Sequence, residues 1–375
     1  MKRHLILVLV VAFSACGHEE DHSTDLTGIP YNPTNWSVEL PENWPQLVIP
    51  EDNPMTEQGI DLGRHLFYDN ILSADNTQSC ASCHEPAGAF TDNKAVSVGI
   101  DGIAGMRSSM SLVNIGLVQP VQSSQEGFLF WDGRAKSLEE QALVPVEDPI
   151  ELHNEWTTVI KELKESPLYQ EKFRKAFGIS STNQITKELA AKAIAQFERS
   201  LLSFNSKYDK VQRDELTYSE DELDGFLRYI DDNDIPLKHQ FECSHCHTLP
   251  LTTSDQFANN AMQPAETLED FEDKGRGAIT GNVAQNGMFR IPTLRNVLHS
   301  APYMHDGSLA TIDDVIEHYF TGGHYSPNAD PTMRDASVPG RKEFDDEDRR
   351  LLKAFLGTFT DTTFLNNPAI RSPFE

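Results

Sequence analysis

Two short stretches of the chain carry the same arrangement of cysteine and histidine. In each stretch, two cysteines stand three positions apart and a histidine follows the second: Cys80, Cys83 and His84, and then Cys243, Cys246 and His247. The chain has five cysteines, so the two motifs take all of them except Cys16. Thiols and imidazoles at this spacing can form a disulfide, bind zinc or attach a haem covalently.

Of these three chemistries, only covalent haem uses every residue of both motifs. A disulfide within each motif leaves the histidines without a role. A single zinc site is disfavoured, because 159 residues separate Cys83 from Cys243 and structural zinc sites usually draw their ligand pairs from nearby. In a c-type haem, the two thiols form thioethers with the vinyl groups and the following imidazole binds the iron. The motifs therefore predict two haem c groups, with His84 and His247 as proximal ligands.

A helix is expected just before each motif. The stretches 56–69 and 219–230 both begin with a hydroxyl residue followed by glutamate. Thr56 and Ser219 are therefore candidate N-caps, with acidic residues in the first helical turn. This weak internal repeat is consistent with two cytochrome-c-like units in tandem.

The remaining periodic segments also predict helices, and no run alternates as a half-buried strand would. These segments are residues 156–165, 169–177, 185–203 and 345–358. Residues 85–130 and 248–290 carry Gly, Pro and Asn, and we expect them to wrap the haems as long loops. The sequence thus predicts a mostly α fold with two tandem cytochrome-c-like haem domains, residues 37–205 and 206–375.

The N-terminus has the features of a bacterial export signal. Two basic residues precede an apolar run, residues 5–13, that is too short to cross a bilayer. Small residues then lead into Cys16, as in a lipobox, so we expect a signal peptide over residues 1–15 and a lipid on Cys16. Ordinary secretion, with Cys16 incidental, is the alternative. Residues 16–36 are polar and are expected to form a tether, which predicts a periplasmic protein anchored to a bacterial membrane by lipid alone.

The chain is strongly acidic. Its formal charge is −27, which becomes −29 once the signal peptide is removed. This charge excludes nucleic acid as a partner, because the phosphates would be repelled. It would attract a basic soluble partner, although selection for solubility alone would give the same composition.

One stretch between the motifs could carry acid–base chemistry. Residues 130–152 contain a tryptophan, an arginine, a glutamine and several acids, and two prolines are expected to stiffen the stretch as a loop. Cleavage of a peroxide O–O bond needs a group that moves a proton from one oxygen to the other. A carboxylate held over an open haem could do so, and Glu147, Asp148 and Glu151 are candidates.

The motifs and their order resemble the bacterial di-haem cytochrome c peroxidase family, which includes the MauG-type enzymes. The resemblance covers about Glu57 to Gly357, most of the mature chain. Besides the two haem motifs, it rests on these segments: Phe90-Thr-Asp, Met110-Ser-Leu-Val-Asn, Phe130-Trp-Asp-Gly-Arg-Ala, Phe289-Arg-Ile-Pro-Thr-Leu-Arg-Asn and Ala301-Pro-Tyr-Met-His-Asp-Gly.

The resemblance implies roles for residues of the first site. Trp131 matches a tryptophan that lies between the two haems and could relay electrons, although core packing would also suit it. Gln141 and Glu151 match the distal glutamine and the catalytic glutamate of the peroxidatic haem. Many members also have a histidine that caps this iron until the second haem is reduced. Ile100 stands in its place and cannot ligate iron, so the first haem is expected to be open.

The resemblance also implies a calcium ion between the haems. Ser108 stands where the family usually has a ligating asparagine, and the carbonyl groups of Ser300 and Pro302 match the other ligands. A serine hydroxyl reaches less far than an asparagine side chain, so Ser108 weakens the expectation of calcium without removing it.

The sixth ligand of the second haem is expected from residues 311–323. Typical peroxidases have methionine at the position of Tyr319, and MauG-type enzymes have tyrosine. Tyr319 completes an apolar helical stripe, whereas His318 lies about 100° away, toward the polar side. Tyr319 is therefore the expected ligand, with His318 and Met304 as rivals and core packing as its alternative role.

Together these features imply a peroxidase that reduces hydrogen peroxide to water at the first haem, with electrons from a cytochrome c or similar donor. One alternative is a MauG-type oxidase that modifies a protein substrate through a high-valent iron pair, which ligation by Tyr319 favours. Another is a di-haem electron-transfer cytochrome without turnover, which Glu151 and Gln141 over an uncapped iron disfavour. A homodimer is a further expectation.

Overall fold

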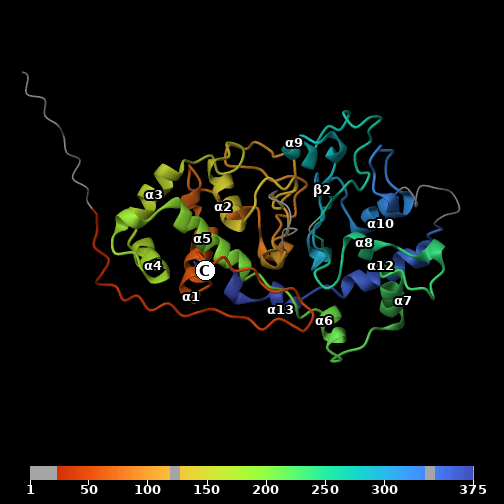
Figure 1. Cartoon of the computed structure of the whole chain (residues 1–375), viewed down its shortest axis with the longest axis horizontal. Coiled ribbons are helices and arrows are strands. Elements are labelled where there is room, and N and C mark those ends of the chain that lie inside the picture. The colour runs from red at the N-terminus through yellow and green to blue at the C-terminus, as the bar shows by residue number, and fades with distance from the viewer. Residues whose placement is uncertain (1–22, 119–126, 255, 334–342, 375) are drawn as a thin grey trace, which may run out of the picture.

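A computed structural model describes residues 23–118, 127–254, 256–333 and 343–374. Over these residues the fold is mostly helical, as predicted. Its sheet is one antiparallel pair of two-residue strands, β1 Phe257–Ala258 and β2 Phe289–Arg290. The helices lie mainly toward the two ends of an elongated molecule, and long loops fill the middle (Figure 1).

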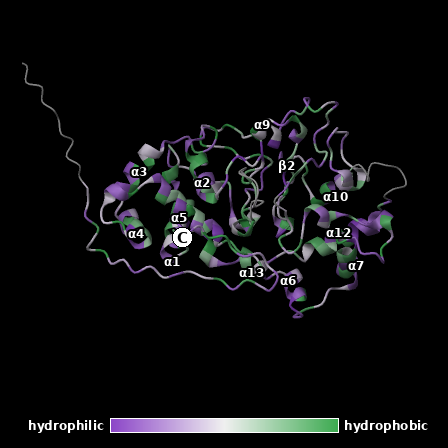
Figure 2. Ribbon diagram, in the orientation of Figure 1, coloured by the Kyte–Doolittle hydropathy of each residue, from purple (hydrophilic) through white to green (hydrophobic). Residues whose placement is uncertain are grey.

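The first group of helices surrounds the larger hydrophobic core. Its members are α1 Glu57–Tyr68, α2 Leu138–Glu147, α3 Trp156–Glu165, α4 Pro167–Phe177 and α5 Lys187–Arg199. These helices carry both hydrophobic and hydrophilic residues, as expected for helices with one buried and one exposed face (Figure 2). The helix before the first motif, α1, packs along α5. Gly63 permits this close contact, because a Cβ there would stand 1.9 Å from the Ala193 carbonyl oxygen.

The second group surrounds a smaller, aromatic core. The helices in this half of the chain are α6 Lys207–Gln212, α7 Glu220–Tyr229, α8 Cys243–Cys246, α9 Arg276–Thr280, α10 Ile312–Thr321, α12 Asp346–Gly357 and α13 Thr362–Leu365. Of these, α13 packs into the first core instead, through Phe364 and Leu365. The helix before the second motif, α7, packs on α12. Here Gly225 permits the approach, because its Cβ would lie 2.2 Å from the Leu351 carbonyl oxygen.

The predicted helices and their caps are confirmed. The Thr56 hydroxyl accepts a hydrogen bond from the Gly59 amide at the start of α1, and the Ser219 hydroxyl accepts one from Glu222 at the start of α7. The expectation of a loop over residues 130–152 is wrong in its middle, where α2 forms with Pro145 inside it. Pro145 removes the amide that would donate to the Gln141 carbonyl oxygen, and the helix ends two residues later.

Both ends of the described chain pack across the molecule. From Asp25 onward, the segment predicted as a tether does not run free, because Leu26 is buried in the first core. Further along, Trp44 packs against Phe204 and over the Arg295 guanidinium, between the two cores. The predicted signal peptide and Cys16 lie outside the described residues. Among the residues that are described, no helix is long and apolar enough to span a membrane.

Candidate active site

The first Cys-x-x-Cys-His motif forms a compact turn directly after α1. Cys80–Ser82 is one turn of 3₁₀ helix, and the His84 amide donates to the Cys80 carbonyl oxygen over 3.0 Å. The Nδ1 atom of His84 lies 2.9 Å from the Phe90 carbonyl oxygen. A ring held through Nδ1 presents Nε2 as its ligating nitrogen, which is the usual arrangement of a metal-binding histidine.

The second motif repeats this arrangement. Cys243–Cys246 is the short helix α8, and the Tyr229 hydroxyl of α7 donates to the His247 carbonyl oxygen over 2.5 Å. The Nδ1 atom of His247 lies 3.1 Å from the carbonyl oxygens of both Thr252 and Pro292. The two histidines therefore have the same fixed orientation, although they share no contact.

The cysteines fit haem attachment better than either rival chemistry. All four are free thiols in the described structure. Burial raises the pKa of each of them, so they are neutral groups in apolar surroundings. No potential metal-binding group among the described residues joins cysteines from both motifs. The disulfide and the shared zinc site are therefore not formed, and the residues present fit two separate haems.

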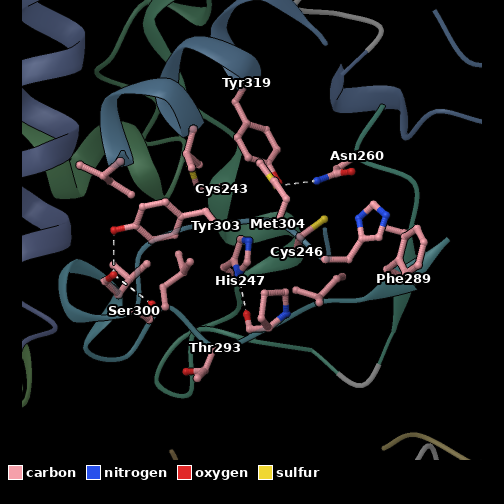
Figure 3. Close-up of a pocket in the computed structure, with 18 of the residues that line it drawn as sticks. Cys243, Cys246, His247, Asn260, Phe289, Thr293, Ser300, Tyr303, Met304 and Tyr319 are labelled. Carbon is pink, nitrogen blue, oxygen red and sulfur yellow. Dashed lines mark hydrogen bonds between the residues drawn. The ribbon is translucent and has the colours of Figure 1, made fainter. Parts of the chain in front are cut away.

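The second motif opens into a broad, mainly apolar cavity (Figure 3). Cys243, Cys246 and His247 line one part of it, and Tyr319 of α10 projects toward them from the other side. About 37% of the Tyr319 surface is accessible, and its ring is part of the cavity wall. Tyr319 and His247 thus line the same cavity.

His318 is placed differently from the expectation drawn from the sequence. It was expected on the polar side of α10, but only 8% of its surface is exposed. Its Nε2 atom lies 2.8 Å from the Asn260 carbonyl oxygen, and His318 is not among the residues that line the cavity. Burial against this loop removes His318 as a rival to Tyr319. The other rival, Met304, does line the cavity.

Trp131 lies where the two sites approach each other. It is in the wall of the second cavity, and its indole N–H donates to the Ser108 carbonyl oxygen over 2.8 Å. The ring meets His305 edge to face, with 6.5 Å between centroids. Thr91 is in the same wall, one residue after the Phe90 carbonyl group that holds His84. Only a few residues thus connect the second cavity with the proximal side of the first motif.

Glu151 lies beside the first motif. It follows α2, and its charge is close enough to raise the pKa of both Cys80 and Cys83. Burial, helped by the negative charge of Asp148, raises the pKa of Glu151 from 4.5 to about 7, against the opposing effect of Arg134. A carboxyl group with this pKa can both accept and donate a proton near neutral pH.

Two other predicted residues of the first site lie on segments that adjoin Glu151. Gln141 is partly buried on α2, the helix that precedes Glu151. Ile100 lies against the same segment, where its amide donates to the Glu151 carbonyl oxygen over 3.0 Å. Beside it, Gly99 must be glycine, because a Cβ would stand 2.3 Å from the Ile150 carbonyl oxygen. The loop that carries Ile100 is therefore packed tightly against the Glu151 segment.

The three residues expected at a calcium ion lie in one wall of the second cavity. However, the Ser108 hydroxyl donates to the Met304 carbonyl oxygen over 2.9 Å, so it is already engaged. The other donors at Ser300 and Pro302 are neutral carbonyl groups, whereas calcium sites usually include carboxylates. This set of donors does not fit a calcium site.

Two contributors to the site had no signal in the sequence. Asn260 stands in a long polar segment in which no pattern marks it, yet it contacts both His318 and Met304. Arg107 joins the two halves of the chain, because its guanidinium binds Asp132 over 2.6 Å and Asp273 over 2.7 and 2.8 Å. Both depend on contacts between residues more than 20 positions apart, which no local pattern records.

Comparison with known proteins agrees with this geometry. The family described as di-haem cytochrome c peroxidase matches residues 57–217. The cytochrome c551 peroxidase of Nitrosomonas europaea is 32% identical, over 84% of this chain and 82% of its own length. The methylamine utilization protein MauG of Methylorubrum extorquens is 31% identical, over 85% of this chain and 82% of its own.

Solved structures give the same result. A MauG-like protein associated with microbial copper homeostasis superposes with a TM-score of 0.75 at 32% identity, covering 91% of this chain and 100% of that one. The fold is also similar to that of the di-haem peroxidase BthA from Burkholderia thailandensis, with a TM-score of 0.69 at 22% identity. That match covers 85% of this chain and 91% of BthA.

Proposed function

This chain belongs to the di-haem cytochrome c peroxidase family, and on that premise we propose that it reduces hydrogen peroxide to water at the first haem. Electrons would enter at the second haem from a cytochrome c or a similar donor. The observation that carries the proposal is Glu151, a carboxyl group with a pKa of about 7 beside the first motif. A cytochrome that only carried electrons would have no use for it.

The chain's own residues would hold the two haems. Cys80 and Cys83 would attach the first, and His84 would bind its iron through Nε2. The second motif would hold the second haem in the same way, with Tyr319 as its sixth ligand. When bound, a haem supplies an iron that exchanges single electrons and a face at which peroxide can be reduced.

Glu151 would move the proton that peroxide cleavage requires. In its ionised form, the carboxylate takes a proton from one peroxide oxygen. In its protonated form, it gives that proton to the other oxygen, which leaves as water. Gln141, on the preceding helix, would orient the peroxide by hydrogen bonding. Ile100 leaves the approach to this site without a capping ligand.

Trp131 would connect the two haems. Its ring lies in the wall of the second cavity, and its N–H bond to Ser108 fixes its orientation. A fixed aromatic ring between the sites suits the passage of electrons toward peroxide, although its packing role is compatible with the same position.

Tyr319 favours a second candidate function, that of a MauG-type oxidase that modifies a protein substrate. A phenolate is a hard donor that stabilises oxidised iron relative to ferrous iron. The second haem would then be a poor electron acceptor from a high-potential donor and better suited to holding an oxidising equivalent. In this case Glu151 would have the same task, but the electrons would come from the substrate protein.

We also propose that the two groups of helices correspond to cytochrome-c-like domains with a boundary near residue 205. The proposed location is the periplasm, with cleavage of the signal peptide before Cys16 and lipid attachment to it. The net charge of −27 supports a basic donor protein. A homodimer remains a prediction on which no part of the mechanism depends.

The test is steady-state peroxide consumption by the protein produced with c-haem maturation. Two haems per chain should survive acid–acetone extraction and denaturing electrophoresis, since they are attached covalently. Peroxide should then be consumed with a small reductant. One haem or none would contradict the assignment of the sites, and two haems without turnover would favour the electron-transfer cytochrome.

A further inference from the structure

The cavity of the second motif presents two side chains that could reach the same iron. Tyr319 and Met304 both line the cavity, and the Met304 sulfur lies near the end of the Tyr319 ring (Figure 3). A phenol oxygen and a thioether sulfur are both known axial ligands of haem iron, and they give it very different potentials. The surroundings of the two side chains in the cavity therefore determine which of them can bind the iron.

The backbone conformation of Met304 is fixed at the wall of the cavity. Its φ angle is 75°, in the left-handed region that a non-glycine residue adopts only when its surroundings hold it there. Its carbonyl oxygen accepts hydrogen bonds from the Ser108 hydroxyl at 2.9 Å and from the Gly307 amide at 3.2 Å. The thioether is thus held inside the cavity by contacts that do not depend on a ligand role.

Asn260 contacts Met304 and lines the same cavity as Tyr319. Its side-chain amide donates to the Met304 sulfur over 3.2 Å. Its backbone carbonyl oxygen lies 2.8 Å from His318 Nε2, which fixes the Asn260 loop against α10. Asn260 therefore links Met304 to α10, through hydrogen bonds to the Met304 sulfur and to His318.

We propose that Asn260 is a positioning residue that selects the sixth ligand of the second haem. Its amide N–H holds the Met304 sulfur against the Asn260 loop, so that the sulfur is kept in that place and the Tyr319 oxygen takes the ligand position. The proposal rests on the assignment of a haem to this cavity. It does not depend on which reaction the first site performs.

The size of the effect follows from one hydrogen bond. A neutral hydrogen bond has a net worth of about 1 kcal/mol, equivalent to about a fivefold change in an equilibrium. Removal of the amide donor should release the Met304 sulfur from this place. The balance between sulfur and oxygen ligation should then move toward sulfur by at least about fivefold.

The experiment uses the full-length holoprotein and compares four variants by the absorption and reduction potential of the second haem. Asn260→Leu keeps the size of the side chain and removes the donor, and Asn260→Ala repeats the test should the leucine variant fail to accumulate. Met304→Leu is the matched control. The double variant Asn260→Leu with Met304→Leu tests whether any new ligand is the sulfur.

The expected result is a sulfur-to-iron charge-transfer band and a raised potential in the Asn260 variants. Met304→Leu alone should match the wild-type protein, and the double variant should lose the band. An Asn260→Leu protein with the wild-type spectrum and potential would overturn the proposal, and so would a new spectrum that persists in the double variant. Loss of peroxide turnover with these spectra intact would contradict the proposed function and leave this inference standing.

Discussion

Replacement of Glu151 by glutamine should lower the rate of peroxide reduction and, at the same time, increase the stability of the folded protein. The amide keeps the shape of the carboxyl group and cannot carry the proton. General acid–base groups contribute about 10²–10⁴-fold to rate, so kcat/KM for peroxide should fall within that range while the haem content stays at two. The dependence of kcat/KM on pH should also lose the step near pH 7 that the pKa of Glu151 predicts.

The same pKa predicts a change in the free energy of unfolding. A rise from 4.5 to about 7 corresponds to about 3 kcal/mol. Below pH 4.5, the carboxyl group is protonated in the folded and unfolded states and has no effect. Between pH 4.5 and 7, the unfolded chain releases the proton while the folded protein keeps it, so stability falls as pH rises. Above pH 7, the full cost of about 3 kcal/mol remains.

Glu151→Gln should therefore be more stable than the wild-type protein at pH 8, by up to about 3 kcal/mol, and equally stable at pH 4. Denaturant unfolding of the holoproteins at the two pH values gives this difference. Glu147→Gln is the matched control, because it makes the same chemical change at an exposed position of α2 and should alter stability by less than about 0.5 kcal/mol. A Glu151→Gln protein with a normal rate, or with no gain in stability at pH 8, would refute the reasoning.

Three further predictions follow from the described contacts. Because Ile100 cannot cap the iron, the fully ferric protein should react with peroxide at once in stopped-flow mixing; a requirement for prior reduction by one electron would reveal another ligand. Tyr319→Met should raise the potential of the second haem and change its ligand-field spectrum, while peroxide binding at the first haem stays unchanged; an unaltered spectrum would leave Tyr319 with a packing role only. Gly63→Ala should lower the free energy of unfolding by about 2 kcal/mol or more, since its Cβ would stand 1.9 Å from the Ala193 carbonyl oxygen; a melting temperature equal to that of the wild type would contradict the close packing of α1 on α5.

The parts of the structure that could be predicted are those whose causes are local. The N-caps at Thr56 and Ser219 depend on residues within one helical turn, and the haem motifs depend on residues within five positions. Each was therefore readable from the sequence. The helix that carries Gln141 could not be predicted in this way, because a proline such as Pro145 usually ends a helix. Only the structure shows that α2 tolerates Pro145 near its C-terminal end.

The errors arose where distant segments meet. His318 was expected on a polar face because only its own helix was considered, yet the Asn260 loop, 58 positions earlier in the chain, covers that face. The segment after Asp25 was expected to be a tether because its composition is polar, and a single anchor such as Leu26 does not alter composition. Contacts of this kind are set by tertiary packing, which sequence periodicity cannot report.

The junction between the two sites is built so that their separation stays fixed. Arg107 binds Asp132, next to Trp131, and also Asp273 from the second half of the chain. These are charge-assisted hydrogen bonds, and two of them form a bidentate pair with Asp273, which adds geometric precision to strength. Trp131 is held on its other side by Ser108, whose hydroxyl also fixes Met304. The segment that would set the proposed electron path between the haems therefore also holds Met304, the proposed rival ligand of the second iron. A change at this junction should alter the transfer of electrons and the ligand of the second haem together, which no change in either core would do.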